Sequence, residues 1–259
     1  DGVTAYVETS IDGKFLSPLD LMVDIGEKDG KRTIKWVPNF RFIDTASVTP
    51  DPETEALAAT LEAGLDKTLN VEIGMSETPL DSRRNVVRGE ESSMGNLIAD
   101  ALRVQTGADI ALMNGGGIRA DRTYDAGVKL TRRDILTELP FGNTTQVTAL
   151  PGSQVLAALE NSVSQVEKGA GRFAQVSGLS FTYDPTAPAG ARVSEVMIAG
   201  APLNLDTVYK VATNDYLIGG GDGYAALGGG KLDPALGGHL VANDVMAYVE
   251  KMGTVKPAV

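Results

Sequence analysis

A glycine turn that carries an arginine is the part of this sequence best equipped for binding chemistry. Gly115, Gly116 and Gly117 follow an apolar run typical of a buried strand, and Arg119 comes two residues later. Three glycines permit a tight turn or a close approach of the backbone to a ligand. The guanidinium fork of an arginine matches a phosphate or a carboxylate. By itself the pattern also fits an ordinary turn with a surface ion pair, so both interpretations stay open here.

Two aromatic residues lie in loops of a chain in which aromatics make up only 5% of the residues. Phe141 stands between Pro140 and Gly142, and Tyr216 precedes the glycine-rich segment 219–223. Two loop aromatics could hold a planar ring between them, and stacking on a base contributes roughly 1–3 kcal/mol. Each ring could equally cap the edge of a core.

Three further side chains could complete a ligand site. Asp222 lies between glycines, where its carboxylate could accept hydrogen bonds from a ribose diol or simply belong to a turn. Arg84 and Arg88 are four residues apart, so they share one face of a helical turn or one side of a strand. In a chain with 34 acidic residues, these arginines are either a local cationic site or ordinary charge balance.

The composition excludes several classes of function. A net charge of -11 argues against sequence-independent binding of nucleic acid, which needs a basic surface. The chain has no cysteine, which excludes disulfides, thiolate catalysis and metal sites with cysteine ligands. Its one histidine, His239, is interpreted as a surface or helix-entry residue, whereas zinc and iron sites usually use two or three imidazoles. We therefore expect this chain alone to be poorly equipped for hydrolysis.

Two targeting signals are not found in the sequence. The chain has no apolar run of about 18 residues or more, which a membrane-spanning helix would need. Its first ten residues lack the basic and apolar regions of a signal peptide. Any signal peptide is therefore expected to lie outside this sequence.

The first 48 residues read as short strands joined by Asp-Gly turns. The runs 4–9, 19–25 and 33–37 favour strands, with turns at 12–13 and 29–30. A few short strands alone cannot form a stable hydrophobic core. We therefore interpret them as the edge of a larger sheet or as an appendage.

A connecting segment follows these strands. Leucines at a spacing of four predict a helix from about Pro52 to Leu69, which we interpret as a connector between domains. A new strand is expected to begin at Val71.

The remainder predicts an α+β, or mixed α/β, domain from about residue 75 to 252. A helix from Met94 to Val104 is expected to start at Ser93 as its N-cap and to stop at Gly107. Thr131 begins a sequence that resembles a capping box. Further patterns favour strands over residues 109–113, 146–150, 179–183, 192–198 and 209–213, helices over 131–139, 151–166 and 242–252, and a tail over 253–259.

Six ordered motifs resemble the C-terminal domain of the 5'-nucleotidase family, which includes UDP-sugar hydrolases and 2',3'-cyclic-nucleotide phosphodiesterases. They cover about 140 residues of the chain. The motifs are Arg84-x3-Arg88, Glu91-Ser92-x-x-Gly95-Asn96-Leu97-Ile98-Ala99-Asp100, Asn114-Gly-Gly-Gly-Ile-Arg119, Leu139-Pro-Phe-Gly-Asn143, Gln175-Val-Ser-Gly-Leu179, and Thr213-Asn-Asp-Tyr216 with Gly220-Gly-Asp-Gly-Tyr224.

The resemblance implies a substrate-binding role for ten residues. Phe141 and Tyr216 would stack on the base, Asn143 would contact the base, and Asp222 would accept from the ribose. The cationic side and the remaining walls of the pocket would come from Arg84, Arg88, Arg119, Asn114, Gly116 and Gly171. The match departs from the family at Arg172, where a smaller residue is expected.

The resemblance also implies a division of labour within a longer protein. Residues 1–48 would be the last strands of a metallophosphatase domain, residues 49–74 a linker, and residues 75–259 the substrate-binding domain. Two divalent metal ions would be bound by the absent part of the metallophosphatase domain, because its histidine-rich motifs are not found here. The resemblance thus implies a periplasmic or extracellular phosphoesterase that binds a nucleoside or nucleotide. The alternative is a catalytically inactive module that only binds nucleosides.

Overall fold

The computed structural model describes residue 9 and residues 13–259. Contacts between residues divide the chain into two compact units, residues 1–64 and residues 65–259. Residues 4–8 of the strand predicted over 4–9, and the first residue of the turn predicted at 12–13, lie outside the described residues.

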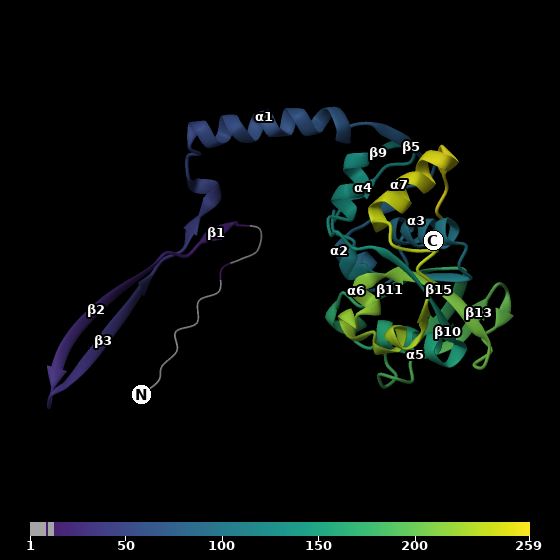
Figure 1. Cartoon of the computed structure of the whole chain (residues 1–259). Helices are drawn as coiled ribbons and strands as arrows, with labels where there is room; N and C mark the ends of the chain where they lie inside the picture. Colours follow the sequence, from purple (N-terminus) through teal and green to yellow (C-terminus); the bar gives the residue numbers. More distant parts are fainter. Residues whose placement is uncertain (1–8, 10–12) are drawn as a thin grey trace. The chain divides into compact units, whose positions relative to one another are not determined.

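A long antiparallel hairpin dominates the first unit. Strands β2 (Leu19–Lys28) and β3 (Lys31–Phe40) pair along their full length (Figure 1). The turn between them is the predicted Asp29-Gly30, and both residues adopt positive φ, as a tight two-residue hairpin turn requires. Two short strands, β1 (Phe15–Leu16) and β4 (Ile43–Asp44), also pair, and the 3-10 turn η1 (Thr45–Ser47) follows.

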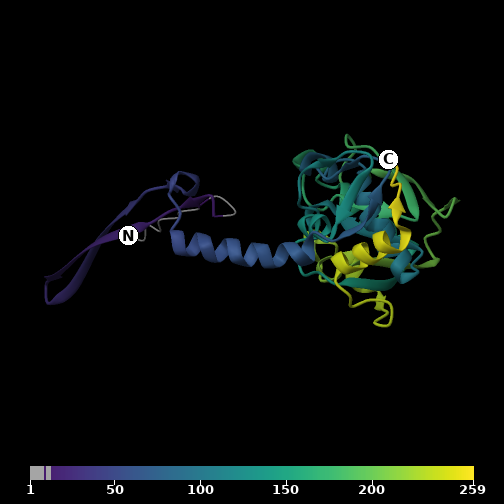
Figure 2. The ribbon, with the colours of Figure 1, turned by 90° about the horizontal axis from the view of Figure 1, so that it is seen from above.

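The register of this hairpin collects apolar side chains on one face. Val23 lies opposite Trp36, and Ile25 lies opposite Ile34. These side chains are all more than 45% exposed. The views in Figures 1 and 2 show the hairpin as a two-stranded ribbon. A two-stranded hairpin with an uncovered apolar face is only marginally stable in water.

The predicted connector is the helix α1 (Pro52–Leu69). Asp51 begins it, because its carboxylate accepts from the backbone N–H and the hydroxyl of Thr54. No residue of α1 is buried, and Leu57, Leu61 and Leu65 are each more than half exposed.

A five-stranded sheet lies at the centre of the second unit. Its strand order is β11-β7-β15-β10-β16. Only β7 and β15 are parallel, and the other neighbours are antiparallel. The strands are β7 (Ile110–Asn114), β10 (Thr145–Pro151), β11 (Ala174–Ser177), β15 (Val208–Asn214) and β16 (Lys231–Leu232).

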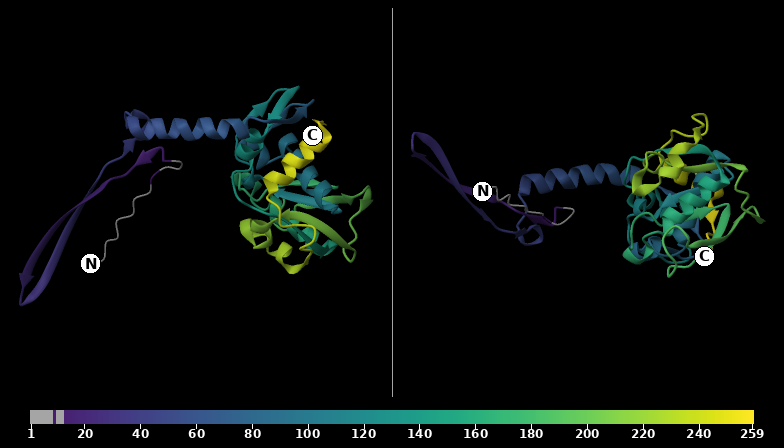
Figure 3. Two further views of the ribbon diagram at one scale, coloured as in Figure 1. Left: turned by 45° about the horizontal axis from the view of Figure 1, so that its top comes forward. Right: turned by 90° about the horizontal axis from the view of Figure 1, so that it is seen from below.

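Helices cover both faces of this sheet, which makes three layers (Figures 1 and 3). Successive residues of β7 point to opposite faces: Ala111 and Met113 join one core, and Ile110 and Leu112 join the other. The first core is shared with α3 (Ser93–Thr106), α4 (Arg132–Glu138) and α7 (Val241–Met252), and the second with α5 (Gly152–Val163) and α6 (Asp215–Ile218).

Smaller sheets and turns complete the unit, and the mixed α/β class predicted from the sequence is confirmed. β5 (Glu72–Ser76) lies between β9 (Val128–Thr131) and β17 (Thr254–Val255). The other elements are β6 (Leu80–Asp81), β8 (Thr123–Tyr124), β12 (Leu179–Tyr183), β13 (Val193–Ile198), β14 (Ala201–Pro202), α2 (Arg84–Val87), and the 3-10 turns η2 (Gly115–Gly117), η3 (Val166–Lys168), η4 (Gly221–Gly223) and η5 (Ala225–Gly229).

The start of α3 differs from the prediction by one residue. Ser92 is the N-cap, because its hydroxyl accepts from the backbone N–H of Gly95. Ser93 is instead the first helical residue, and its hydroxyl accepts from the backbone N–H of Asp81. Two adjacent serines offer the same capping chemistry, so the local sequence could not distinguish them. Gly107 ends the helix in the left-handed conformation, as predicted.

The prediction of a C-terminal tail over residues 253–259 is wrong. Thr254 and Val255 form β17, which pairs in parallel with β5. Beyond the strand, the carbonyl of Pro257 accepts from the hydroxyl of Thr78 at 2.8 Å. These contacts join positions far apart in the sequence, and the segment is too short to show a periodic pattern. The helix predicted over 151–166 is also shorter, since α5 ends at Val163.

Candidate functional site

The candidate site lies at one edge of the central sheet, where several strand ends meet. The parallel strands β7 and β15 end side by side at Asn114 and Asn214, and the Asn214 amide donates to Asn114 Oδ1 at 3.1 Å. The antiparallel neighbours β11 and β10 begin at this same edge, which places the loops before them there. The chain therefore brings glycine turns and two aromatic residues from distant segments to one place.

A cavity of about 470 Å³ opens at this edge. Its volume falls within the range of small-molecule sites, about 300–1,000 Å³. Nine of the ten residues predicted from the sequence line it, together with Gly117; they are Arg88, Asn114, Gly116, Arg119, Phe141, Asn143, Gly171, Tyr216 and Asp222. The tenth, Arg84, is exposed and is not among the lining residues.

Asn114 and Asp222 form the polar floor of the cavity. The buried Asn114 amide donates to Asp222 Oδ2 at 2.8 Å, and Tyr216 Oη donates to the other carboxylate oxygen at 3.1 Å. Each carboxylate oxygen therefore has one protein donor. Because an ionised carboxylate can accept about four hydrogen bonds, it can accept more from a ligand.

The two aromatic rings that line the cavity are each about half exposed to solvent. Phe141 lies in the loop after α4, whereas the prediction that Tyr216 lies in a loop is wrong, because it belongs to the short helix α6 that Asn214 caps. Phe141 is 50% exposed and Tyr216 is 47% exposed. The guanidinium carbon of Arg119 lies 5.5 Å from the centre of the Phe141 ring, a distance suited to a cation–π contact. The Asn143 amide donates to Asp215 Oδ1 at 2.8 Å. Half-exposed rings that line a cavity are suited to stacking on a flat ligand.

Arg88 is the cation most strongly affected by its surroundings. Its side chain is buried, and among the described residues its Nε has no hydrogen-bond partner. Burial lowers the pKa of Arg88, and the positive charges of Arg84 and Arg119 lower it further. The carboxylates of Asp222 and Asp121 offset this only in part. A buried guanidinium with an unused donor favours an anion beside it.

The glycines of the turn allow the backbone to pack without side chains. A Cβ on Gly115 would lie 1.9 Å from the carbonyl oxygen of Val87, and one on Gly116 would lie 3.0 Å from the Cα of Gly171. The Gly116 N–H donates to the Gly171 carbonyl at 2.7 Å. The glycine turn is therefore required by close packing on two sides, which a simple surface turn would not need.

Comparison with known proteins supplies the family. Residues 72–229, more than half of the chain, match the model of the 5'-nucleotidase C-terminal domain. The chain belongs to the 5'-nucleotidase family. It contains that family's C-terminal domain.

Members of the 5'-nucleotidase family resemble the chain in both sequence and structure. It is 37% identical to a trifunctional nucleotide phosphoesterase of Bacillus subtilis, over 82% of this chain and 15% of that protein. It is 36% identical to a 5'-nucleotidase of Vibrio vulnificus, over 83% of this chain and 36% of that protein. A crystal structure of a Thermus thermophilus 5'-nucleotidase precursor superposes with a TM-score of 0.74 at 33% identity, over 95% of this chain and 49% of that one. This chain thus spans less than half of the length of each of these proteins.

The part of this 5'-nucleotidase family chain that the structure describes contains no group of three or more histidine, cysteine, aspartate or glutamate side chains that could hold a metal ion. No helix in that part is long and apolar enough to cross a membrane. His239 lies on the surface as predicted, 78% exposed and 3.6 Å from Asp244.

Three residues around the cavity at the sheet edge had no role assigned from the sequence. Asn214 stands behind Asn114, and Asn161 donates to the backbone carbonyl of Asp222 at 3.2 Å. Arg172, where the family pattern predicts a smaller residue, donates to Asn161 Oδ1 and is not among the residues that line the cavity. All three act through tertiary neighbours, so a motif comparison alone gives them no role.

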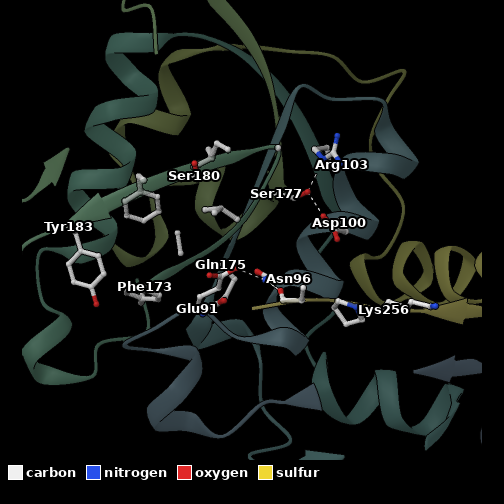
Figure 4. Close-up of a pocket in the computed structure, with 17 residues that line it drawn as sticks. Glu91, Asn96, Asp100, Arg103, Phe173, Gln175, Ser177, Ser180, Tyr183 and Lys256 are labelled. Atoms are coloured by element: carbon white, nitrogen blue, oxygen red, sulfur yellow. Dashed lines mark hydrogen bonds between the residues drawn. The ribbon is translucent and has the colours of Figure 1, made fainter. Parts of the chain in front are cut away.

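A second cavity of about 500 Å³ lies beside α3 and β11 (Figure 4). It shares no lining residue with the first cavity. Ser177 joins Arg103 and Asp100 at one side, and Phe173 and Tyr183 lie at the other. The buried polar side chains of this cavity already bond to the protein. Their donors are thus already used, in contrast to the free donor of Arg88, and the first cavity is the better ligand site.

Proposed function

We propose that this chain is the substrate-binding part of a 5'-nucleotidase-type phosphoesterase and that the cavity at the sheet edge holds the nucleotide. The observation that carries the proposal is the buried Arg88 Nε with no partner among the described residues, beside two exposed aromatic rings. An anionic group and a flat ring in one ligand match these two features. A nucleoside phosphate has both.

The proposed roles follow from the chemistry of each wall. Phe141 and Tyr216 stack on the base, and Asn143 contacts its polar edge. Asp222 accepts from the ribose hydroxyls, with Asn114 beside it. The phosphate side is cationic: Arg88 and Arg119 line it, and Arg84 adds its positive charge near Arg88 from outside the lining. Gly116 and Gly171 let the backbone approach the ligand.

The cationic side is notable because the whole chain carries a charge of -11. A field of that sign repels an anionic ligand at long range, and salt screens it beyond about 8 Å. Binding must therefore come from local contacts. The guanidiniums of Arg88 and Arg119, which line the cavity, supply them. A partly desolvated charge pair is stronger than the same pair in water.

Hydrolysis itself is proposed for another part of a longer protein. In that protein two divalent metal ions would activate the water that attacks the phosphate. The proposed contribution of the residues described here is to hold base and ribose and thereby to position the ester. We propose that this chain alone binds but does not hydrolyse, and that the intact protein works in the periplasm or outside the cell.

The exposed apolar face of the β2–β3 hairpin supports the existence of further partner strands. Val23, Ile25, Ile34 and Trp36 lie on this face, and such a face is normally covered by another layer. The layer proposed here is the remainder of the metallophosphatase domain. The relatives described above have ample length for it, since the chain spans 15% to 49% of them.

Calorimetric titration of the 259-residue chain with AMP, GMP, CMP and UMP tests the proposal. We expect saturable binding of at least one nucleotide, and no release of phosphate when Mn²⁺ is added. Binding of none of the four would contradict the proposed function. Phosphate release by the pure chain would contradict the assignment of catalysis elsewhere. If a longer protein with this chain binds nucleotide but never hydrolyses it, the function is nucleoside binding without catalysis.

A further inference from the structure

Asp222 is held in a backbone conformation that its residue type rarely adopts. Its φ is +52°, in the left-handed region. Non-glycine residues in that region are uncommon and are often held there by surrounding contacts at functional sites. Its neighbours Gly220 and Gly223 also have positive φ, at 84° and 81°. A glycine at position 222 would adopt this conformation with less strain. The turn nevertheless carries an aspartate there.

Four hydrogen bonds fix this aspartate from all sides. The hydroxyl of Tyr216 accepts from the Asp222 backbone N–H at 3.2 Å and donates to Oδ1 at 3.1 Å. Asn114 donates to Oδ2 at 2.8 Å, and Asn161 donates to the backbone carbonyl at 3.2 Å. Among the residues that the structure describes, Tyr216 is thus the one hydrogen-bond partner of both the backbone and the carboxylate of Asp222.

The position of the Tyr216 ring depends on the glycine beside the aspartate. A Cβ on Gly221 would lie 2.5 Å from ring atoms of Tyr216, so the ring lies directly against the Gly221 backbone. Burial and the hydrogen bond to Asp222 raise the pKa of Tyr216 above its ordinary value. The hydroxyl is therefore protonated at neutral pH and can donate to the carboxylate.

We propose that Tyr216 is a positioning residue as well as a stacking surface, and that its hydroxyl sets the preference for a ribonucleoside over the free base. The hydroxyl holds the Asp222 carboxylate toward the cavity, where both oxygens keep lone pairs for a ribose diol. A phenylalanine would provide the same ring without this contact. The proposal rests on the proposed function, because it concerns how the same cavity recognises ribose.

The substitution Tyr216→Phe separates the two roles of this residue. The probes are the ribonucleoside whose monophosphate binds best and its free base, each titrated into the full chain. We expect the affinity for the nucleoside to fall about tenfold, the order expected for losing a hydrogen bond to a charged group. The affinity for the free base should change less than twofold, because the ring remains. The matched control is Tyr209→Phe, which removes a hydroxyl that accepts from Asn204 N–H outside the cavity.

A double substitution tests whether the hydroxyl acts through the aspartate. In an Asp222→Asn background, Tyr216→Phe should cause no further loss of nucleoside affinity, because the group that it positions is already altered. Additive losses would overturn the positioning role. So would an unchanged ratio of nucleoside to base affinity in Tyr216→Phe, or equal losses for both ligands, which would indicate a displaced ring. If the unaltered chain binds neither probe nor any nucleotide, the proposed function itself is wrong.

Discussion

Arg88 and Arg103, two arginines of the second unit, differ in how their side-chain donors are satisfied. Arg88 is buried beside the cavity, its Nε has no partner among the described residues, and its NH1 reaches only the carbonyl of Gly169 at 3.5 Å. Arg103, beside the second cavity, donates from Nε to Ser177 at 2.7 Å. An unsatisfied buried donor destabilises the fold, whereas a satisfied one does not. The proposed role of Arg88 in binding an anion would explain why this unsatisfied donor is present.

Substitution of these two arginines should have opposite effects. Arg88→Met should weaken AMP binding at least tenfold and leave thermal stability unchanged or higher, because a costly buried charge is removed. Arg103→Met should lower the midpoint of thermal unfolding and leave AMP binding unchanged. Calorimetric titration and thermal denaturation of both variants check this. A large loss of stability in Arg88→Met, with AMP affinity kept, would show that Arg88 is only a structural residue.

Local motifs in the sequence predicted correctly which residues lie together at the cavity. Phe141, Arg119 and Asp222 line one cavity, as their motifs led us to expect. The side chain of Arg84 does not line the cavity. Its direction depends on how helix α2 packs against the rest of the unit, and a local motif does not specify that packing. The bond between Tyr216 and Asp222 could not be predicted either, because it requires an uncommon positive φ that no local pattern specifies.

The end of helix α4 positions two parts of the site at once. Glu138 is fully buried and accepts from Tyr124 Oη of β8 at 2.8 Å and from the Ala120 N–H at 3.3 Å. Its backbone carbonyl accepts from the Arg119 N–H at 2.9 Å. The same residue directly precedes the loop that carries Phe141. Glu138 thus joins the arginine turn, β8 and the aromatic loop.

This buried carboxyl should make stability depend on pH. Burial raises the pKa of Glu138 above its ordinary value. The folded state therefore holds the proton more tightly, so the stabilisation is complete below the unfolded pKa of about 4.3 and is lost as pH rises through the folded pKa. Urea unfolding of the native chain and of the Glu138→Gln variant, from about pH 4 to about pH 7, measures the contribution of this carboxyl to the free energy of unfolding. We subtract the free energy of unfolding of the variant from that of the native chain and expect this difference to fall as pH rises. A difference that stays constant or rises would show that the pKa of Glu138 is not raised in the folded state.

Element types were largely predictable, but long-range pairing was not. The capping box at Thr131 and Asp134 is present as predicted, because its chemistry is local. The sequence predicts a tail over residues 253–259, whereas Thr254 and Val255 form β17. This strand depends on its pairing with β5, which is distant in the sequence. The order of strands in the central sheet depends on contacts between distant segments, and these leave no periodic signal in a single sequence.

The two units differ in how far they can be stable alone. Both hydrophobic cores consist of residues from Ile73 to Val255, so the second unit contains them entirely. The first unit exposes the apolar face of its hairpin. We expect residues 65–259 alone to fold and to bind AMP as tightly as the full chain. They should also bind less of a dye that reports exposed apolar surface, because the hairpin is gone.

Circular dichroism, dye fluorescence and AMP titration of the shortened chain check this expectation. The full 259-residue chain is the matched control. A shortened chain that fails to fold would show that the first unit contributes to the core of the second. A folded chain with weaker AMP binding would show that residues before Leu65 contribute to the site.

The central claim is that nucleotide binds in the cavity lined by Phe141, and one paired titration tests it most directly. AMP, or the best-bound nucleotide, is titrated into the unaltered chain, Phe141→Ala and Phe42→Ala. Phe42 is the control because it is 56% exposed, similar to Phe141 at 50%, and does not line the cavity. We predict a loss of about tenfold or more for Phe141→Ala, as stacking on a base implies, and none for Phe42→Ala. Equal affinity in all three proteins would contradict the account.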